Sequence, residues 1–342
     1  MLETVYFGTY TKKESQGIYA ADFDSTTGEL SDLRLVVKAE NPIYLAFSED
    51  DFLYSAIAQG DKGGIASFDQ QFTLLNQVLE DGKPPCYVAY NAKRHLVFSA
   101  NYHIGEVLVY QEEKDGCLTL LNKLAHHDSG PHPNQSSAHI HFANLTPDRF
   151  LLTCDSGTDT VTCYDLNEAG KLTEIATYQA QTGAGCRHIV FHPFLKIAYL
   201  ACKLNSTVEV LIYDGYGEFE HYETHSTLPQ DYQGDNAVAA IRISPDGRFL
   251  YVSNRGHDSI AVFKLIGDGQ LEILQIISTS GKMPRDFSLT PDTNHLIVVH
   301  QESNNATVFK RDQATGLLTE LYHDFYVPEA VCITFRKEKH AS

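Results

Sequence analysis

Residues 244–254 read Ser-Pro-Asp-Gly-Arg-Phe-Leu-Tyr-Val-Ser-Asn, a turn followed by an apolar run that ends in polar side chains. Pro, Asp and Gly are favoured in tight turns, and a run of aromatic and β-branched residues is typical of a strand. A second extended run precedes the turn, so the passage predicts two strands joined by a tight connection. Variants of this passage recur at Ser48–Ala58, Asn91–Asn101, Thr146–Asp155, His192–Cys202 and Thr290–His300.

The repeat has a regular length. Seven equivalent positions, near the start of the strand before each turn, are Ile43, Cys86, His141, Arg187, Ala239, Arg285 and Glu329. By subtraction, they are separated by 43, 55, 46, 52, 46 and 44 residues. Repeats of this length made only of strands and turns are typical of a β-propeller, in which each repeat forms one blade. The sequence therefore predicts an all-β, seven-bladed propeller, in which residues far apart in the chain meet around one axis.

Each repeat offers four strands, which we denote A to D with A innermost. A third run follows a polar loop, as at Ile260–Lys264, and a fourth follows a glycine turn, as at 269–271. The last run, Glu329–Phe335, matches strand A, and the first, Thr4–Tyr10, matches strand B. We therefore expect one blade to be assembled from both ends of the chain, which closes the ring and removes its open edge. Because blades stack on their neighbours and cannot fold singly, we expect one domain over residues 1–342.

The composition excludes several classes of function. Apolar residues make up 43% of the chain and charged residues 20%, as in ordinary soluble domains. No apolar run is long enough to span a membrane, and the N-terminal segment reads as a strand rather than a signal peptide. The seven cysteines form no Cys-x-x-Cys pair, which favours reduced thiols and a cytoplasmic location. The net charge of −18 argues against nucleic-acid binding, and an anionic ligand would need a local group of cations.

Strands A and B form a hairpin, so the start of A lies beside the end of B, on the face opposite the Pro-Asp turn. The starts of the A strands hold Tyr44, Tyr87, His139, His141, Arg187, His188, Arg285 and Glu329. The ends of the B strands hold Asn101, Tyr102, Asp155, Lys203, Asn254, Arg255 and Gln301. Four cations would therefore converge on one opening, where guanidinium groups suit carboxylate or phosphate oxygens, and we predict a small anionic substrate. The alternative is that Arg255 and Arg285 are structural and pair with Asp258 and Asp286.

His139 and His141 are two residues apart, so on a regular strand both side chains would point to one face. Two imidazoles on a strand are a known metal-ligand pattern, but no third ligand stands at a fixed offset, and the neighbouring cations would repel a metal ion. No phosphate-binding loop, dinucleotide motif or zinc spacing is present, so we expect neither metal nor cofactor. The favoured interpretation of His141 is a neutral imidazole that acts as general base on water, its pKa lowered by surrounding cations.

Several motifs together resemble one family. They are Asn101-Tyr102 after a strand, His139-Ile140-His141, Arg187-His188 with Phe191-His192-Pro193, Ser206-Thr207-Val208, Ser244–Ile260, Pro284-Arg285-Asp286-Phe287 and Val331–Phe335. Over essentially the whole chain the sequence is similar to the seven-bladed propeller lactonases, which include a 6-phosphogluconolactonase and carboxymuconate lactonizing enzymes. The resemblance implies metal-independent hydrolysis of a sugar-acid lactone in the cytoplasm, within the pentose phosphate pathway. It also implies site residues at His141, Arg187 and Arg255.

One position departs from the family pattern. The resemblance implies an acid at the end of strand B in the fourth repeat, where relatives usually read Asn-Glu-Leu, but this chain reads Cys202-Lys203-Leu204. A lysine there removes a candidate acid or base and adds an anchor for phosphate. Three interpretations stay open: the histidine acts alone, a carboxylate comes from another position, or the ligand has changed. The candidate carboxylates are Asp155, Asp235 and Glu329.

The leading hypothesis is hydrolysis of 6-phosphogluconolactone to 6-phosphogluconate. In this hypothesis Arg187 polarises the carbonyl group and His141 takes a proton from water. The phosphate contacts are assigned to Lys203, Arg255 and Arg285, and further substrate contacts to Asn101, Tyr102, His139, His188 and Asn254. One alternative is a lactonizing or lactone-opening reaction on a dicarboxylate of the muconate type. Another is a non-catalytic propeller that binds a protein, against which the absence of Trp and of a recurring Gly-His and Trp-Asp signature argues.

Overall fold

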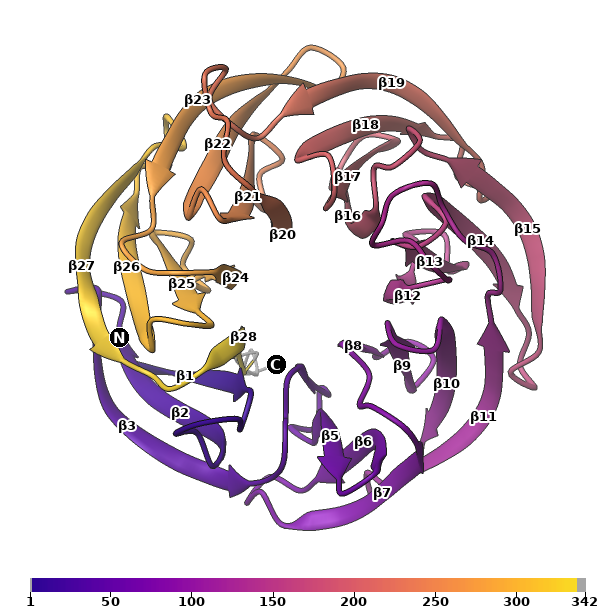
Figure 1. Ribbon diagram of the computed structural model, residues 1–342. Helices are drawn as coiled ribbons and strands as arrows, with labels where there is room; N and C mark the ends of the chain where they lie inside the picture. Colours follow the sequence, from indigo (N-terminus) through magenta and orange to yellow (C-terminus); the bar gives the residue numbers. More distant parts are fainter. Residues whose placement is uncertain (1, 337–342) are drawn as a thin grey trace.

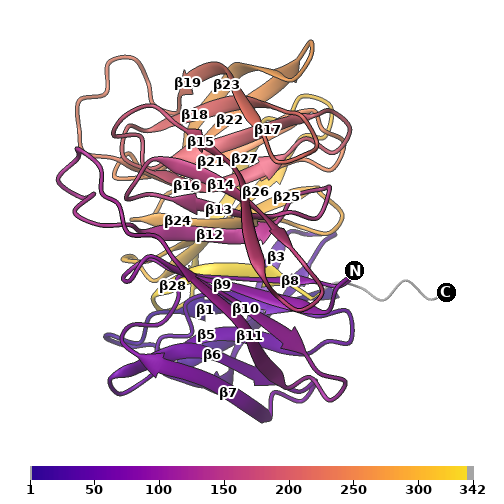
Figure 2. The ribbon, with the colours of Figure 1, turned by 90° about the vertical axis from the view of Figure 1, so that its right-hand side faces the viewer.

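The computed structural model describes residues 2–336, which form strands β1 to β28 in seven four-stranded antiparallel sheets. Viewed along the axis, the sheets are the blades of a closed ring (Figure 1). Turned by 90°, the same blades are seen edge-on, with the connecting loops on the two faces of a disc (Figure 2). The all-β, seven-bladed architecture predicted from the repeat is confirmed. Within residues 2–336, no helix is long and apolar enough to cross a membrane.

We number the blades by the order of their innermost strands along the chain. Blade 1 contains β4 (Leu45–Phe47), β5 (Leu53–Gln59), β6 (Lys62–Phe68) and β7 (Leu74–Asp81), and blade 2 contains β8 (Tyr87–Asn91), β9 (Leu96–Asn101), β10 (Glu106–Glu112) and β11 (Leu118–Ala125). Blade 3 contains β12 (Ile140–Leu145), β13 (Leu151–Asp155), β14 (Thr160–Leu166) and β15 (Leu172–Gln179). Blade 4 contains β16 (Cys186–Phe191), β17 (Ile197–Cys202), β18 (Thr207–Tyr213) and β19 (Phe219–Ser226). Blade 5 contains β20 (Ala237–Ile243), β21 (Phe249–Arg255), β22 (Ser259–Ile266) and β23 (Gln270–Ser278). Blade 6 contains β24 (Pro284–Leu289), β25 (His295–His300), β26 (Asn305–Arg311) and β27 (Leu318–Tyr326). Blade 7 contains β28 (Ala330–Phe335), β1 (Leu2–Thr9), β2 (Gly17–Asp24) and β3 (Glu29–Lys38).

Blade 7 closes the ring, as the sequence predicted. Its innermost strand, β28, pairs antiparallel with β1, and Phe7 lies opposite Ile333. Around the axis each innermost strand contacts the next, and β28 contacts both β24 and β4. The two ends of the chain are therefore part of one continuous ring, which leaves no inner strand without a neighbour.

The turn between β20 and β21 shows how the local sequence makes the repeat. The backbone N–H of Gly247 donates to the carbonyl oxygen of Ser244 at 2.8 Å, and Gly247 has a φ of +69°, a conformation that glycine adopts at little cost. The hydroxyl of Ser244 donates to Asp246 at 2.5 Å. The chain therefore reverses at Pro-Asp-Gly, and the apolar runs on either side pair as strands.

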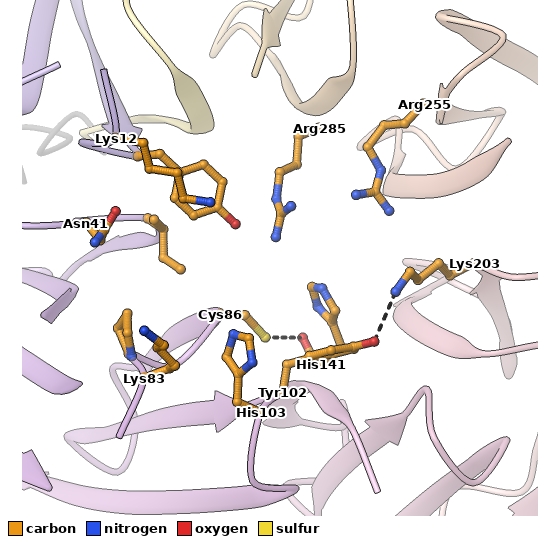
Figure 3. Close-up of a pocket in the computed structure, with 13 residues that line it drawn as sticks. Lys12, Asn41, Lys83, Cys86, Tyr102, His103, His141, Lys203, Arg255 and Arg285 are labelled. Atoms are coloured by element: carbon orange, nitrogen blue, oxygen red, sulfur yellow. Dashed lines mark hydrogen bonds between the residues drawn. The ribbon is translucent and has the colours of Figure 1, made fainter. Parts of the chain in front are cut away.

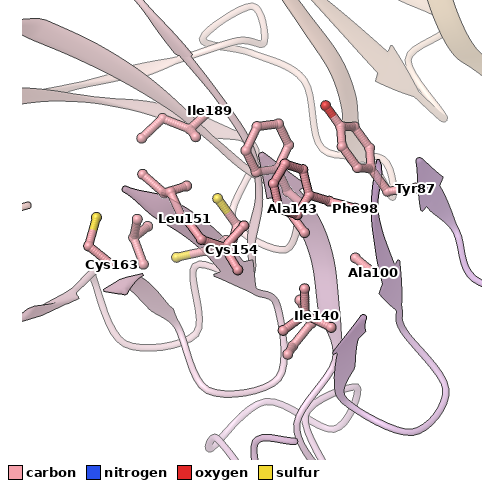
Figure 4. Close-up of a cluster of buried hydrophobic side chains, with 14 of the residues drawn as sticks. Tyr87, Phe98, Ala100, Ile140, Ala143, Leu151, Cys154, Cys163 and Ile189 are labelled. Carbon is pink, nitrogen blue, oxygen red and sulfur yellow. The ribbon is translucent and has the colours of Figure 1, made fainter. Parts of the chain in front are cut away.

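Apolar side chains from adjacent blades interlock between the sheets. In one such cluster, Phe98 of blade 2 and Leu151 of blade 3 are both fully buried (Figure 4). Cys154 and Cys163 lie in the same cluster, where they serve as small apolar side chains, and burial raises the pKa of Cys154 well above its usual value. All seven cysteines are free thiols. Packing of this kind fixes each blade against its neighbours and so fixes the positions of the inner strands.

Candidate active site

Irregular pairing at the starts of the inner strands changes the direction of three side chains. In β12 the register passes from Ile140 directly to Phe142, so His141 has no partner across the hairpin. The same shift leaves out Arg187 in β16 and Arg285 in β24. A bulge of this kind leaves one residue unpaired and re-aims its side chain. Strict alternation, which the sequence analysis assumed for this region, does not hold here.

A cavity of about 360 Å³ lies where the starts of the inner strands meet the ends of their partners (Figure 3). Its volume is within the range of small-molecule sites, roughly 300–1,000 Å³. The residues that line it are Tyr10, Lys12, Asn41, Ile43, Lys83, Pro84, Cys86, Tyr102, His103, His141, Lys203, Arg255 and Arg285. Five of these described residues are lysine or arginine, and none is aspartate or glutamate. The cavity is therefore strongly cationic, although the whole chain has a net charge of −18.

Three of the cations come from three successive blades. Lys203 follows β17 of blade 4, Arg255 ends β21 of blade 5, and Arg285 lies in β24 of blade 6. Arg255 is buried, its Nη2 donates to the carbonyl oxygen of Val238 at 3.3 Å, and its Nε has no partner within the described chain. Arg285 donates to the side-chain oxygen of Gln301 at 3.2 Å. The ring therefore brings together side chains that are widely separated in sequence.

The acidic partners considered for these arginines are engaged elsewhere. Asp286 forms an ion pair with Arg242, with an oxygen–nitrogen distance of 2.8 Å. Asp258 accepts hydrogen bonds from the backbone N–H groups of Gly256 and Met283. Across residues 2–336, neither Arg255 nor Arg285 forms an ion pair with a carboxylate. The structural alternative from the sequence analysis is therefore wrong for these two residues, and their charges face the cavity uncompensated.

Lys203 is held against an aromatic ring in the same wall. Its Nζ lies 3.3 Å from the hydroxyl oxygen of Tyr102 and 4.8 Å from the centre of that ring. Burial, and then the charges of Arg255 and Arg187, lower the pKa of Lys203 to about 7. Lys203 is therefore only partly protonated near neutral pH.

His141 is 5% exposed and lines the cavity between Arg285 and Tyr102 (Figure 3). Its ring contacts those of Tyr102 and His188, with centroid distances of 5.8 and 5.1 Å. Burial, followed by the charge of Arg187, lowers the pKa of His141 well below its usual value. Its Nδ1 is buried without a partner in the described chain. The imidazole is therefore neutral at pH 7 and has an unused nitrogen.

Arg187 and His188 lie behind the wall of this cavity and not on it. Arg187 is 2% exposed, and its Nη1 donates to the carbonyl oxygen of Ala239 and lies 3.3 Å from Nδ1 of His188. Burial and the charge of Arg285 lower the pKa of Arg187 to about 10, so it stays charged. His188 lines a separate cavity of about 250 Å³ together with residues such as Tyr87. The direct substrate contacts predicted for Arg187 and His188 are therefore corrected, because neither residue lines this cavity.

Three other predicted contacts also have structural partners. The side chain of Asn254 is fully buried and bonds to Thr227, Asn236 and Ser259, so it does not reach the cavity. The amide of Asn101 is occupied by backbone groups of Lys83 and His103. His139 stacks on Tyr102 at 4.2 Å between ring centres, and its Nδ1 lies 2.7 Å from the carbonyl oxygen of that residue. Of the further contacts predicted at Asn101, Tyr102, His139 and Asn254, only Tyr102 lines the cavity. No group of three or more metal-ligating side chains comes together within residues 2–336.

None of the candidate carboxylates reaches the cavity. Asp155 is fully buried and accepts hydrogen bonds from Nδ1 of His126 and from the backbone N–H of His139. Asp235 is exposed and is not a lining residue. Glu329 accepts hydrogen bonds from four successive backbone N–H groups, those of residues 12–15. In β28 the unpaired residue is Val331. The position in blade 7 that is equivalent to His141 is therefore Val331, two residues after the predicted Glu329.

Sequence reasoning missed several residues of the wall. Tyr10, Lys12, Asn41, Lys83 and His103 all line the cavity, and they lie one to four residues outside the nearest inner strands of the structure. A wider window around the starts of A and the ends of B would have included them. Nothing in the repeat itself shows which loop residues turn inward, because the loops differ in length from blade to blade.

The fold and the cavity define a propeller with a cationic cavity at the meeting point of its blades. The chain belongs to the seven-bladed β-propeller lactonase family: the sequence model described as "Lactonase, 7-bladed beta-propeller" matches residues 4–335. It is therefore a lactonase enzyme that acts on a small-molecule lactone. Among curated proteins, the 6-phosphogluconolactonase of Bacillus subtilis is 38% identical over 340 residues, which cover 96% of this chain and 97% of the relative.

Two solved structures are similar to this chain over nearly their whole length. A protein from Lactobacillus plantarum has a TM-score of 0.97 and 44% identity, and the match covers 98% of this chain and 100% of that one. The periplasmic gluconolactonase of Pseudomonas aeruginosa has a TM-score of 0.90 and 29% identity, with 98% and 99% covered. The family expected from the sequence motifs is confirmed.

Proposed function

We propose that this lactonase hydrolyses 6-phosphogluconolactone to 6-phosphogluconate. The observation that carries the proposal is the combination of a buried neutral imidazole, His141, with uncompensated cations in one cavity. The neutral base serves the attack of water, and the cations serve a phosphorylated substrate whose reaction develops a further negative charge. The 38% identity to a relative named 6-phosphogluconolactonase supports the choice of lactone.

In the proposed reaction, water adds to the lactone carbonyl carbon while His141 accepts one of its protons. The carbonyl oxygen becomes an oxyanion, which the guanidinium groups of Arg255 and Arg285 stabilise. Collapse of this intermediate breaks the bond between the acyl carbon and the ring oxygen, and the protonated His141 gives its proton to that oxygen, which becomes a hydroxyl group. The product is one open-chain hydroxy acid, whose new carboxyl group ionises and releases a proton to water. A positioned base contributes about 10²–10⁴-fold, which suffices for an ester that already hydrolyses in water.

The test is an assay of the purified protein on freshly prepared 6-phosphogluconolactone, with acid release measured against buffer. We expect His141→Asn to lower kcat by roughly 10²–10⁴-fold while the melting temperature is kept, because the variant removes the base but no packing contact of comparable size. His221, which is exposed on β19, the outermost strand of blade 4, and does not line the cavity, gives the control variant His221→Asn. Equal rates for buffer, His141→Asn and the unaltered protein would refute the proposal.

A dicarboxylate of the muconate type remains the second candidate, because cations bind carboxylates as well as phosphates. The same assay with gluconolactone, 6-phosphogluconolactone and a muconolactone compares the substrate classes directly. The third hypothesis, a propeller that only binds another protein, loses support because the chain belongs to a family of lactonases.

We also propose a cytoplasmic location, where the pentose phosphate pathway would supply the phosphorylated lactone. Seven free thiols, six of them buried in a structure without disulfides among its described residues, support a reducing compartment. Cell fractionation with an antibody to the protein tests this, and recovery from the cell exterior would contradict it.

A further inference from the structure

Four of the five cations that line the cavity form two groups on opposite walls, and Arg285 lies between them (Figure 3). Lys203 and Arg255 lie on one side, near His141, and Lys12 and Lys83 lie on the other (Figure 3). The two groups differ in burial: Arg255 is 8% exposed, whereas Lys12 and Lys83 are exposed at the rim. A substrate that spans the cavity would therefore meet buried cations on one side and solvent-exposed cations on the other.

The loop that carries Lys12 is held by several hydrogen bonds. The carboxylate of Glu329 accepts the backbone N–H groups of residues 12, 13, 14 and 15 at 3.0, 3.0, 2.9 and 3.0 Å. On the other side of the loop, the backbone N–H of Thr11 donates to Oδ1 of Asn41 at 3.2 Å, and the N–H of Asn41 donates to the hydroxyl of Thr11 at 3.1 Å. The Nζ of Lys12 lies 4.2 Å from the ring centre of Tyr10, another lining residue. This exposed lysine is therefore part of a fixed wall.

Lys83 is held from the neighbouring blade. Asn101 donates from Nδ2 to the carbonyl oxygen of Lys83 at 2.9 Å and accepts the backbone N–H of His103 at 3.1 Å. One amide thus positions two lining residues. Burial, then the charge of Lys83, lower the pKa of His103, and Lys12 contributes in the same direction. Both lysines are therefore close enough to act on the same imidazole, which stays neutral and can share a hydrogen bond with a ligand.

The rim lysines have no acidic partner. Within the described chain, neither Lys12 nor Lys83 forms an ion pair, and no carboxylate lines the cavity. Two lysines that line one side of the cavity, act on the same imidazole and have no acidic partner in the described chain are suited to an anion. Exposure at the rim also suits a doubly charged group, because removing such a group from water completely is costly.

We propose that Lys12 and Lys83 form a second anion subsite, which takes the phosphate of the substrate while the neutral lactone ring lies beside His141. This assignment rests on the proposed function for the identity of the substrate. It reverses the expectation that Lys203, Arg255 and Arg285 hold the phosphate. If the phosphate occupied the buried wall, it would neutralise the arginines before the reaction, whereas a neutral ring leaves them free for the charge that develops in the transition state.

The first experiment compares two substrates. In the double variant Lys12→Met and Lys83→Met, we expect KM for 6-phosphogluconolactone to rise about tenfold or more, because charge-assisted contacts to the phosphate are lost. KM for gluconolactone and kcat for both substrates should change less than about twofold, since the ring and the base are untouched. Lys13→Met is the matched control, because Lys13 lies in the same loop but does not line the cavity. Equal effects on both lactones, or an effect confined to Lys203→Met and Arg255→Met, would overturn the assignment.

A binding measurement separates this inference from the hydrolysis itself. By calorimetry, the unaltered protein should bind 6-phosphogluconate more tightly than gluconate, and the double variant should lose that difference while Lys13→Met keeps it. This result would support the subsite even if the protein hydrolysed neither lactone. No preference for the phosphorylated acid in the unaltered protein would refute the subsite, whatever the catalytic rate.

Discussion

His141 and Lys203 line the same cavity, and burial lowers the pKa of both side chains. The protonation states that result are different. The pKa of His141 is lowered well below its usual value, so its ring is neutral across the physiological range. The pKa of Lys203 is lowered to about 7, so its charge changes within that range. His141 is therefore suited to accept a proton, and Lys203 is a cation whose presence depends on pH. The neighbouring Arg187, whose pKa is about 10, keeps its charge throughout.

The pH dependence of anion binding tests Lys203. With a pKa of about 7, its charged fraction falls from about nine-tenths at pH 6 to about one-tenth at pH 8, so affinity for gluconate should fall about tenfold over that interval. Gluconate is chosen because its carboxylate stays ionised. Lys203→Met should bind more weakly at pH 6 and show little change with pH. An affinity that stays constant between pH 6 and 8 in the unaltered protein would show that Lys203 does not titrate there or does not contact the anion.

At the scale of elements, the loops between strands decide what the cavity contains. The bulges in β12 and β24 turn His141 and Arg285 out of the regular pairing. The loop after β1 carries Lys12, and it is fixed by Glu329 from the other end of the chain. The same contact thus closes blade 7 and shapes the wall.

Glu329 gives a prediction about stability. Burial acts to raise its pKa, but the N–H groups of Ser15, Lys13, Glu14 and Lys12 outweigh burial, and the pKa is lowered. A lowered carboxyl pKa contributes stability above the unfolded value, about 4.3, which is lost as the pH falls through the folded value. We expect Glu329→Gln to reduce the free energy of unfolding at pH 7 by about 1.5–3 kcal/mol, as for hydrogen bonds to a charged group. Urea unfolding at pH 7 and pH 3 measures this, and a difference that persists undiminished at pH 3 would contradict the role of the charge.

For the whole molecule, closure of the ring makes each blade depend on its neighbours. The inner strands contact one another all the way around the axis, including β28 with β4. The electrostatics also depend on the whole molecule. The net charge of −18 repels an anion at a distance, whereas the closed ring places five cations from different blades around one cavity.

Matched core variants test the strength of closure. Phe7 in β1 and Phe98 in β9 are both fully buried and occupy the second strand of their blades. If blade 7 is as well integrated as blade 2, Phe7→Ala and Phe98→Ala should each lower the free energy of unfolding by about 3–5 kcal/mol, with one cooperative transition. Chemical denaturation followed by circular dichroism and by tyrosine fluorescence measures both. A separate early transition in Phe7→Ala alone would show that the closing blade opens independently.

The repeat spacing and the Pro-Asp turns were sufficient to predict seven blades and closure by the two termini. These features depend on local alternation and turn chemistry, which a sequence displays directly. The same alignment correctly brought Lys203, Arg255 and Arg285 to one cavity, because equivalent positions in a ring face one axis. It failed for Asn254 and Arg187, whose side chains are occupied by neighbouring groups.

What the chain alone determined is the architecture and the convergence of positive charge, since both follow from periodic patterns along the sequence. The tertiary structure decided which cations stay unpaired, that Glu329 holds a loop instead of facing the ligand, and that Lys12, Lys83 and His103 complete the wall. Those outcomes depend on bulges and on contacts between residues hundreds of positions apart, such as Lys12 with Glu329. No local pattern encodes them, because each depends on how two separate loops meet after the ring has closed.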